Sequence, residues 1–529
     1  MAKKPVLISV VVILAVIGLL PLLVMFLRSV RVEGHFSFAA YESLLASTNE
    51  WILLKHSLTL SFLTTLFCAI IGVPLGILLA KTDIPFRGIF VVIFTIPLLI
   101  APYIMAVSWF NLLGREGLLA RFWGERTAAV TSEFLFGLPG CVLVLFSTYM
   151  PVVMLLTITF LKTINPRLEE AGKIVSGWPD VLKSITIPLI MPGVLLSCLL
   201  VFLLTLGEFG VPMFLRYNVF PVETFTQFSA FYDFGAATAG AIPLALITAL
   251  AILFERIFLR KKTYQVKLAS EGNRTIVICL GRFRKWFAIS VGILCSFMVI
   301  LPLLVLVLQS MSFNAYARGV DLAGDSLIRS LFYAAIGASM LIAIGFFCGY
   351  LIHNRSLFLW QSMDSLTLFL FALPGTLIGI GLVLLWNKPV TNFVYATPII
   401  IIFGYIAQYT ALTSRVTVSM LTQIPASMEE AAQIVGAGWL RRIRAIVCPL
   451  AKRGLVAGWL IAYIFCLRDM GISMLVYPPG HDTLPVRTFT LMANGPADLI
   501  AALCVIMVLA TLLPLGILTV VFRSRGPTE

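Results

Sequence analysis

The chain has 529 residues, of which 60% are hydrophobic and 12% are charged, and its formal net charge is +14 at pH 7. A soluble domain must present a largely polar surface and cannot hide this much apolar sequence in one core. The apolar residues also stand in blocks of about 20, which matches the thickness of a bilayer core. The composition therefore excludes a soluble protein and predicts a polytopic membrane protein.

In chain order, the apolar blocks predict twelve membrane-spanning helices. They are too long and too uniformly apolar for the alternating strands of an outer-membrane barrel, so we expect an all-α bundle. Pro and Gly blur the ends of the third and ninth blocks, and the first block lacks a small-residue cleavage site, so we expect it to be a retained span. The predicted spans are 6–27, 57–80, 88–113, 138–161, 193–215, 236–259, 286–308, 331–352, 364–386, 396–420, 454–477 and 498–521.

The placement of the basic residues predicts the orientation. A basic linker, 261–285, separates the sixth and seventh blocks, and further basic residues precede the first block at Lys3 and follow the last at Arg523. The loop 114–137 on the opposite side carries a balanced charge. Basic residues are retained on the cytoplasmic side, so both termini and the linker are expected there. The clustering of basic residues at the membrane flanks also argues against nucleic-acid binding.

The nine cysteines are scattered and mostly lie inside the apolar blocks. No CxxC and no Cys/His pair at ligand spacing occurs, so the pattern predicts neither a disulfide framework nor a zinc site. The sequence predicts no catalytic residue, no cofactor and no resident metal.

The chain repeats itself. Matches that recur in the same order indicate duplication of a six-span unit, with halves at 1–260 and 286–529. Six is even, so both halves have the same topology, and we expect the transport path between them. The offset shifts along the chain because the loop 114–137 is longer than its counterpart. The matches are Ser57 with Ser330, Gly72 and Gly76 with Gly345 and Gly349, Pro97 and Trp109 with Pro374 and Trp386, Glu169 with Glu429, Pro188 with Pro449, and Thr224 with Thr488.

Between the fourth and fifth spans, each half carries a polar loop, 165–192 or 425–453, expected in the cytoplasm. Asn165 followed by Pro166 predicts an N-cap and a first-turn proline. Ser427 with Glu430 predicts a capping box. The first helix of each loop also begins with paired glutamates, which the helix dipole favours in a first turn.

The rest of each loop predicts a bend and a second short helix. The glycines at 177, 436 and 438 are expected to break the first helix. Pro188 and Pro449 are expected to stop the second. Each loop is therefore predicted to be a compact helical elbow at the membrane surface, and we refer to 165–192 as the first elbow and 425–453 as the second.

The elbows resemble the EAA motif of binding-protein-dependent ABC importer permeases, and the resemblance covers essentially the whole chain. In that family the elbow docks into a cleft on a separate ATPase subunit. The first copy departs from the pattern, because Gly172 replaces the second alanine and one residue is missing near Gly177. The resemblance implies coupling roles for Glu169, Glu170, Ala171, Gly177, Pro188, Glu429, Glu430, Ala431, Ala432, Gly436 and Pro449.

The resemblance also implies the fold and the partners. The fold would be that of a type I ABC importer permease, with two parallel six-helix repeats in the bacterial inner membrane. The partners would be two copies of a cytoplasmic ATPase, an external substrate-binding protein and membrane lipid. The chain contains no GxxxxGK[ST] loop, so it is not expected to be an enzyme, and ATP hydrolysis would come from the partner subunits.

Intramembrane charges predict the substrate path, because they are costly and usually functional. Glu208 lies in the fifth span, and Asp469, preceded by Arg468, is its repeat partner. The two acids are expected to face each other across the pseudo-two-fold axis and to line the path or its gate. Alternatively, each acid is paired internally, Asp469 with Arg468 or with a residue of a neighbouring helix.

Two external loops, 216–218 and 477–483, could contact a binding protein. The Pro-Pro-Gly stretch at 478–480 and the Leu-Gly-Glu-Phe-Gly stretch at 206–210 are similar to fused permeases of the ferric-iron importer group. The same branch includes permeases for thiamine, phosphonates, sugar phosphates and polyamines. His481 and Asp482 could ligate a metal, but a turn is the simpler interpretation of this pair.

Two other function classes remain open on the sequence. An ion-coupled secondary transporter would use Glu208 and Asp469 for coupling, but its usual Gly/Asp/Arg-rich loop is only weakly matched by 81–87. A channel or scaffold explains the duplication but not the two elbows. The importer permease explains both, and the resemblance to the ferric-iron group implies ferric iron as its substrate.

Overall fold

The computed structural model describes residues 3–32, 35–232, 234–259 and 276–523. Apart from one isolated bridge and a short antiparallel hairpin, β1 (Arg31–Val32) and β2 (His35–Phe36), the regular structure of these residues is helical, so the expected all-α fold is confirmed. Ten helices are long and apolar enough to cross a membrane, and two bent helix pairs raise the number to twelve if each pair is one span. Residues 260–275 of the basic linker lie outside the described residues.

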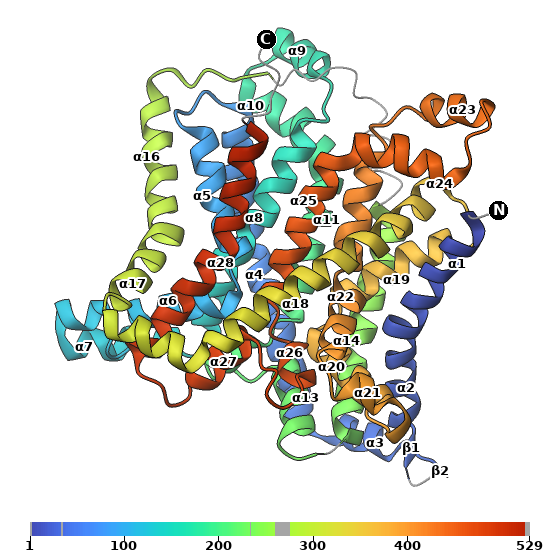
Figure 1. Cartoon of the computed structure of the whole chain (residues 1–529). Coiled ribbons are helices and arrows are strands. Elements are labelled where there is room, and N and C mark those ends of the chain that lie inside the picture. Colours follow the sequence, from blue (N-terminus) through green and yellow to red (C-terminus); the bar gives the residue numbers. More distant parts are fainter. Residues whose placement is uncertain (1–2, 33–34, 233, 260–275, 524–529) are drawn as a thin grey trace. The chain divides into compact units, whose positions relative to one another are not determined.

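The chain forms two compact units. One contains Thr48–Val222 and Leu246–Met311, and the other contains Met1–Ser47, Glu223–Ala245 and Ser312–Glu529. The first predicted span thus belongs to the unit built on the second half of the sequence, and the seventh belongs to the unit built on the first half (Figure 1). The compact units therefore exchange one span relative to the sequence halves.

The unit built on 48–222 is organised around α4, α8 and α11, each of which packs against the other two. Helix α6 packs against α8, α7, α12 and α17, and α16 lies beside α5 (Figure 1). The helices of this unit are α4 (Thr48–Lys81), α5 (Arg87–Leu99), α6 (Pro102–Leu113), α7 (Leu118–Leu135), α8 (Leu138–Leu161), α9 (Pro166–Val175), α10 (Trp178–Val181), α11 (Ile187–Leu206), α12 (Gly210–Phe214), α16 (Arg284–Cys295) and α17 (Leu301–Gln309).

The other unit repeats this plan around α18, α22 and α25, with α2 against α20 in place of α17 against α6. Its helices are α1 (Lys3–Leu14), α2 (Leu20–Ser29), α3 (Ala39–Ala46), α18 (Phe313–Asn354), α19 (Trp360–Ala372), α20 (Gly375–Trp386), α21 (Asn392–Tyr395), α22 (Ile399–Leu421), α23 (Ala426–Ile434), α24 (Trp439–Arg442), α25 (Cys448–Leu467), α26 (Ser473–Val476), α27 (Leu484–Leu491) and α28 (Ala497–Arg523). Along the chain, α13 (Phe220–Ser229) and α14 (Phe234–Phe254) lead from one unit to the other.

The repeated glycines lie where the central helices cross. A Cβ atom on Gly76 of α4 would come within 2.9 Å of the Met154 carbonyl oxygen of α8. A Cβ atom on Gly349 of α18 would come within 2.6 Å of the Ser414 carbonyl oxygen of α22. Small residues let helix backbones approach closely, so these glycines serve packing.

The two bent pairs lie where the sequence predicts blurred spans. Helices α5 and α6 meet at 102°, and α19 and α20 meet at 106°. Each break is an extended dipeptide, Ile100–Ala101 before Pro102 and Leu373–Pro374 before Gly375. A residue before proline avoids the α region, which explains the first break.

The helix bounds also correct the sequence repeat. The breaks place Ala101, and not Pro97, at the position equivalent to Pro374, because Pro97 lies inside α5. Trp109 lies in the middle of α6, whereas Trp386 ends α20. The pairing of these prolines and tryptophans is therefore wrong, because the residue types match but their positions relative to the breaks do not.

The expectation that Pro188 and Pro449 stop the second helix of each elbow is also wrong. The helix continues through both prolines into the spans Trp178–Leu206 and Trp439–Leu467. Proline lacks an N–H and its ring clashes with the carbonyl of the preceding turn, but a wider π turn accommodates it. Four such turns, each two residues before a proline, are Ala15–Leu19, Leu182–Thr186, Ser296–Ile300 and Ile443–Val447.

Candidate functional site

The first elbow begins as its sequence predicts. The Asn165 side chain accepts the Arg167 backbone N–H at 3.1 Å, and Pro166 is the first residue of α9. The helix ends at Val175, where the Ser176 N–H bonds back to the Gly172 carbonyl oxygen at 3.0 Å. Gly177 then leads into α10.

Glu169 is the buried anchor of the first elbow. Its side chain accepts the Lys81 ammonium at 2.5 Å and the Thr186 hydroxyl at 2.8 Å, and the residue is 1% exposed. Lys81 is the last residue of α4, so an ion pair ties the elbow to that span. Glu169 therefore faces inward, whereas its neighbour Glu170 is exposed.

Gly172 has a packing reason for its departure from the motif. A Cβ atom at this position would lie 2.6 Å from the Ile185 side chain and 3.2 Å from the Val181 side chain. Helix α9 therefore lies closer to the following helix than an alanine would allow without a shift of Ile185.

The second elbow begins differently from the prediction. Helix α23 starts at Ala426, and Pro425 holds the N-cap position without a side-chain bond. Ser427 therefore lies inside the first turn, and the capping box with Glu430 is not formed. The proline at the N-cap position starts the helix two residues earlier than a Ser427 cap would.

Glu429 is the counterpart of Glu169, and its surroundings are different. It is half-buried and accepts the Tyr350 hydroxyl at 3.3 Å. Tyr350 in turn accepts the indole N–H of Trp439 at 3.1 Å, and Trp439 is buried at the start of α24. Gly436 has φ of +84°, a left-handed conformation that favours glycine. The second elbow is thus held by aromatic residues.

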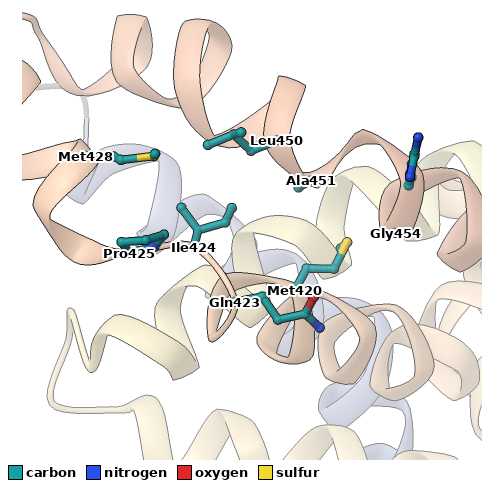
Figure 2. A pocket seen from close by; sticks show the side chains of 9 residues that line it. Met420, Gln423, Ile424, Pro425, Met428, Leu450, Ala451 and Gly454 are labelled. Atoms are coloured by element: carbon teal, nitrogen blue, oxygen red, sulfur yellow. The ribbon is translucent and has the colours of Figure 1, made fainter. Parts of the chain in front are cut away.

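Two of the hollows against the second elbow lie beside its first helix, α23. One, of about 370 Å³, opens between the end of α22, the start of α23 and the start of α25. Figure 2 shows Met420 and Gln423 on the α22 side of this hollow and Leu450 across from them. It is lined by Met420, Gln423, Ile424, Pro425, Met428, Leu450, Ala451, Arg453 and Gly454. The second hollow, of about 260 Å³, includes Lys3, Tyr350, His353, Asn354, Glu429 and Arg442 in its lining.

The most exposed apolar residues of the elbows were not predicted as site residues. Ile174 and Val175 are both 87% exposed, and Ile434 and Val435 are 86% and 88% exposed. Each pair lies where the first helix of its elbow ends, with Val175 as the last residue of α9 and Val435 as the C-cap of α23, and the two pairs are equivalent in the repeat. The signal was present in the sequence as a repeated Ile-Val pair at the end of a polar helix, and exposed apolar pairs of this kind are typical of a docking surface.

The other predicted coupling residues fall into two groups. Most are exposed and available to a partner, whereas Ala432 is only half-exposed. The exposed residues are Glu170, Ala171, Gly177, Pro188, Glu430, Ala431, Gly436 and Pro449.

The two intramembrane acids have closely similar local environments. The Tyr149 hydroxyl donates to Glu208 at 2.9 Å, and the Tyr409 hydroxyl donates to Asp469 at 2.8 Å. Each acid also accepts a backbone N–H from the short helix that follows, that of Gly210 at 3.2 Å or that of Ser473 at 3.0 Å.. Tyr149 and Tyr409 occupy equivalent repeat positions, and the sequence analysis predicts a role for neither.

Internal pairing with a neighbouring helix is therefore confirmed for both acids. Asp469 is 5% exposed and also accepts the Ser473 hydroxyl at 2.8 Å, whereas Glu208 is half-buried. The Arg468 guanidinium lies 4.1 Å from the ring centre of Phe465. A role of these residues in the path stays a prediction.

The loop 477–483 forms the turn expected for it. The His481 N–H bonds to the Pro478 carbonyl oxygen at 3.0 Å, and Gly480 has φ of +76°. The His481 ring bonds Tyr333 at 2.9 Å, and Asp482 accepts Arg329 at 2.7 Å. Within the described residues, no cluster of three or more His, Cys, Asp or Glu side chains could hold a metal ion.

The same loops confirm the serine match of the repeat. The Ser57 hydroxyl oxygen accepts the Phe220 N–H at 2.9 Å, and the Ser330 hydroxyl oxygen accepts the Leu484 N–H at 2.6 Å. In the first half, the start of the second predicted span thus binds the segment that follows Glu208. In the second half, the start of the eighth predicted span binds the segment that follows Asp469.

Sequence reasoning missed three charged residues at helix ends or inside predicted spans. Lys81 closes α4, and Asp364 of α19 pairs with Arg415 of α22 at 2.7 Å. Asp364 and Arg415 interrupt apolar blocks, which was a usable signal. Neither has a charged counterpart in the other half, so neither belongs to the repeated pattern.

Apolar spans in a duplicated helical arrangement, with one polar elbow per repeat, define the class of membrane transport permeases. The comparison with family models gives the particular family. The chain belongs to the binding-protein-dependent transport system inner membrane components, whose model matches residues 72–264 and 342–525. It is therefore a multi-pass inner membrane protein and a transporter component.

Individual relatives are more distant. The chain is 24% identical to the ferric transport system permease protein FbpB of Actinobacillus pleuropneumoniae over 83% of its own length, a match that spans 66% of that protein. It is 23% identical to a putative ferric transport system permease of Haemophilus influenzae, over 86% of this chain and 74% of that protein. The molybdenum transport system permease protein ModB of Escherichia coli is 27% identical over 42% of this chain and 96% of its own length.

Proposed function

We propose that this chain is the translocation subunit of an ATP-driven importer that carries ferric iron into the cytoplasm. Three relatives that match more than four fifths of the chain are ferric transport permeases. The molybdenum permease matches less than half of the chain, so it supports the transport class more than the substrate.

The observation that carries this proposal is the repeated pair of elbows with exposed Ile-Val ends. Each elbow offers an apolar pair beside an exposed glutamate, Glu170 or Glu430, and no nucleotide-binding loop occurs in the chain. Two copies of a separate ATPase would dock there, one per elbow. An external binding protein would deliver the substrate on the opposite side.

The elbows, both termini and the linker would then lie in the cytoplasm. The chain itself provides a test, because Cys279 in the linker is the one exposed cysteine among its nine. A membrane-impermeant maleimide should label Cys279 in inside-out vesicles and not in intact spheroplasts. Labelling in spheroplasts would reverse the orientation, and Cys279→Ser is the control for residual labelling.

The docking test uses native mass spectrometry of the chain purified with its ATPase. We expect two ATPase copies per chain, one copy for Ile174→Asp or Ile434→Asp, and none for the double variant. Val390→Asp is the matched control, because Val390 is also 86% exposed and lies outside the elbows. Unchanged binding in the double variant would contradict docking at these pairs.

The substrate test uses proteoliposomes that contain the complex and its binding protein. ATP-dependent uptake of ferric iron, without uptake of molybdate or 2-aminoethylphosphonate, is the expected result. Uptake of molybdate alone would overturn the assignment. A chain that moves solute without an ATPase, on an ion gradient, would overturn the importer class.

The path would include Glu208, Arg468 and Asp469. Carboxylates and tyrosines are hard oxygen donors, which suit a hard cation such as ferric iron. Glu208→Gln should lower iron uptake at least tenfold while both ATPase copies stay bound. Full uptake in this variant would remove Glu208 from the path.

A further inference from the structure

Three consecutive residues at the end of α4 join this helix to two other segments of the chain. Lys81, Thr82 and Asp83 contact the first elbow on one side and the chain leading into α16 on the other. We call these three residues the Lys81 junction. All of its contacts lie within the unit built on 48–222.

The first arm of the junction is the buried ion pair. The Lys81 ammonium reaches Glu169 at 2.5 Å, and the two side chains are 3% and 1% exposed. The Thr186 hydroxyl holds the other carboxylate oxygen, so both halves of the elbow, α9 and the π turn before Pro188, meet at one carboxylate.

The second arm is mostly backbone. The Lys81 carbonyl oxygen accepts the Ile278 N–H at 2.6 Å, and Thr82 and Ile278 form a parallel bridge. The Asp83 carboxylate accepts the Leu280 N–H at 3.0 Å and lies 3.8 Å from the Arg284 guanidinium. The last part of the linker is therefore fixed to α4 just before α16 begins.

The second half lacks this arrangement. Asn354 stands at the repeat position of Lys81, and within the described part of the chain no ion pair involves Glu429. Glu429 is held by the Tyr350 hydroxyl instead, and the Lys3 ammonium lies 5.6 Å from the Tyr350 ring centre.

We propose that Lys81 is a positioning residue. Through it, the first elbow transmits more of the ATPase movement to the membrane helices than the second elbow does, and we call this the lever assignment. Separating a buried ion pair in a medium of low dielectric constant is resisted more strongly than stretching a hydrogen bond at a half-exposed site. When the ATPase moves the first elbow, α4 and the start of α16 thus move with it. The second elbow is held more weakly, so it can shift without moving the helices around it. This inference rests on the proposed importer function.

The test measures ferric-iron uptake per ATP hydrolysed in proteoliposomes of the full complex. Lys81→Met should lower this ratio at least tenfold while two ATPase copies still bind. The charge exchange Lys81→Glu with Glu169→Lys should restore it to within about threefold of the wild type. Tyr350→Phe, the matched variant of the second half, should change the ratio less than threefold.

Asp83→Asn tests the second arm without removing a buried charge, because the Asp83 side chain is 27% exposed. We expect a loss of about threefold in uptake per ATP, with normal ATPase binding. This variant keeps the test decisive if Lys81→Met fails to fold.

The outcomes separate the two proposals. If the wild-type chain binds no ATPase, the proposed function fails. If the wild type couples normally and Lys81→Met or Asp83→Asn does not lower the ratio, or if Tyr350→Phe lowers it as much, only the lever assignment fails.

Discussion

The two elbows occupy equivalent places in the repeat but are anchored by different chemistry. The first is fixed by a buried ion pair with α4, and the second by a hydrogen bond from Tyr350 at a half-buried site. A duplicated motif thus keeps its outer surface, the exposed glutamate and the Ile-Val pair, while its inner attachment diverges. The difference shows that the partner-facing and scaffold-facing sides of one motif can change independently.

The largest expected effect concerns the anchoring glutamates. Glu169→Ala leaves the Lys81 ammonium buried without its partner, and we expect a loss of about 3–5 kcal/mol in unfolding free energy. Glu429→Ala should lose only about 1 kcal/mol, because it removes one long hydrogen bond at a half-buried site. Equilibrium unfolding in mixed detergent micelles measures both, and equal losses would break the comparison.

The intramembrane acids Glu208 and Asp469 should also differ in how much their hydrogen bonds stabilise the fold. Here the larger effect is expected in the second half. Tyr409→Phe removes a donor from the buried Asp469, and we expect a loss of about 1.5–3 kcal/mol. Tyr149→Phe should lose about 1 kcal/mol, because Glu208 is only half-buried. The same unfolding assay applies, and a larger loss for Tyr149→Phe would contradict the burial argument.

The bends of the elbows give a smaller contrast. Gly436 has positive φ, so Gly436→Ala should lose about 1–2 kcal/mol. Gly177 has φ of −74°, which any residue adopts, so Gly177→Ala should change stability by less than about 0.5 kcal/mol. Thermal unfolding of the two variants side by side is sufficient, and a shift for Gly177→Ala alone would contradict the assigned bends.

The smallest expected effect is at the second motif alanine. Gly172→Ala gains about 1 kcal/mol of helix propensity, but its Cβ atom must displace the Ile185 side chain, so the two effects should nearly cancel. Ala432→Gly in the second elbow should lose about 1 kcal/mol. A clear stabilisation by Gly172→Ala would mean that the close approach of α9 to Ile185 is not needed.

Much of the fold was predictable because a bilayer imposes length and apolarity on each span. The block 138–161 was predicted with the bounds that α8 has, and the blurred blocks are the bent pairs. Asn165 was predictable as a cap because capping is local. The continuation of the helix through Pro188 and Pro449 was not predictable, because proline alone does not mark a π turn: Pro151 lies inside α8 without one.

The sequence by itself determined the membrane class, the duplication and the position of both elbows, because these follow from residue type, length and repetition along the chain. Only the tertiary structure decided which glutamate of each pair faces inward, that Tyr149 and Tyr409 hold the acids, and that Lys81 joins the first elbow to α4 and the linker. These contacts link residues that are 59, 60 and 88 positions apart. Such contacts depend on how the spans pack, and packing leaves no local pattern in the sequence.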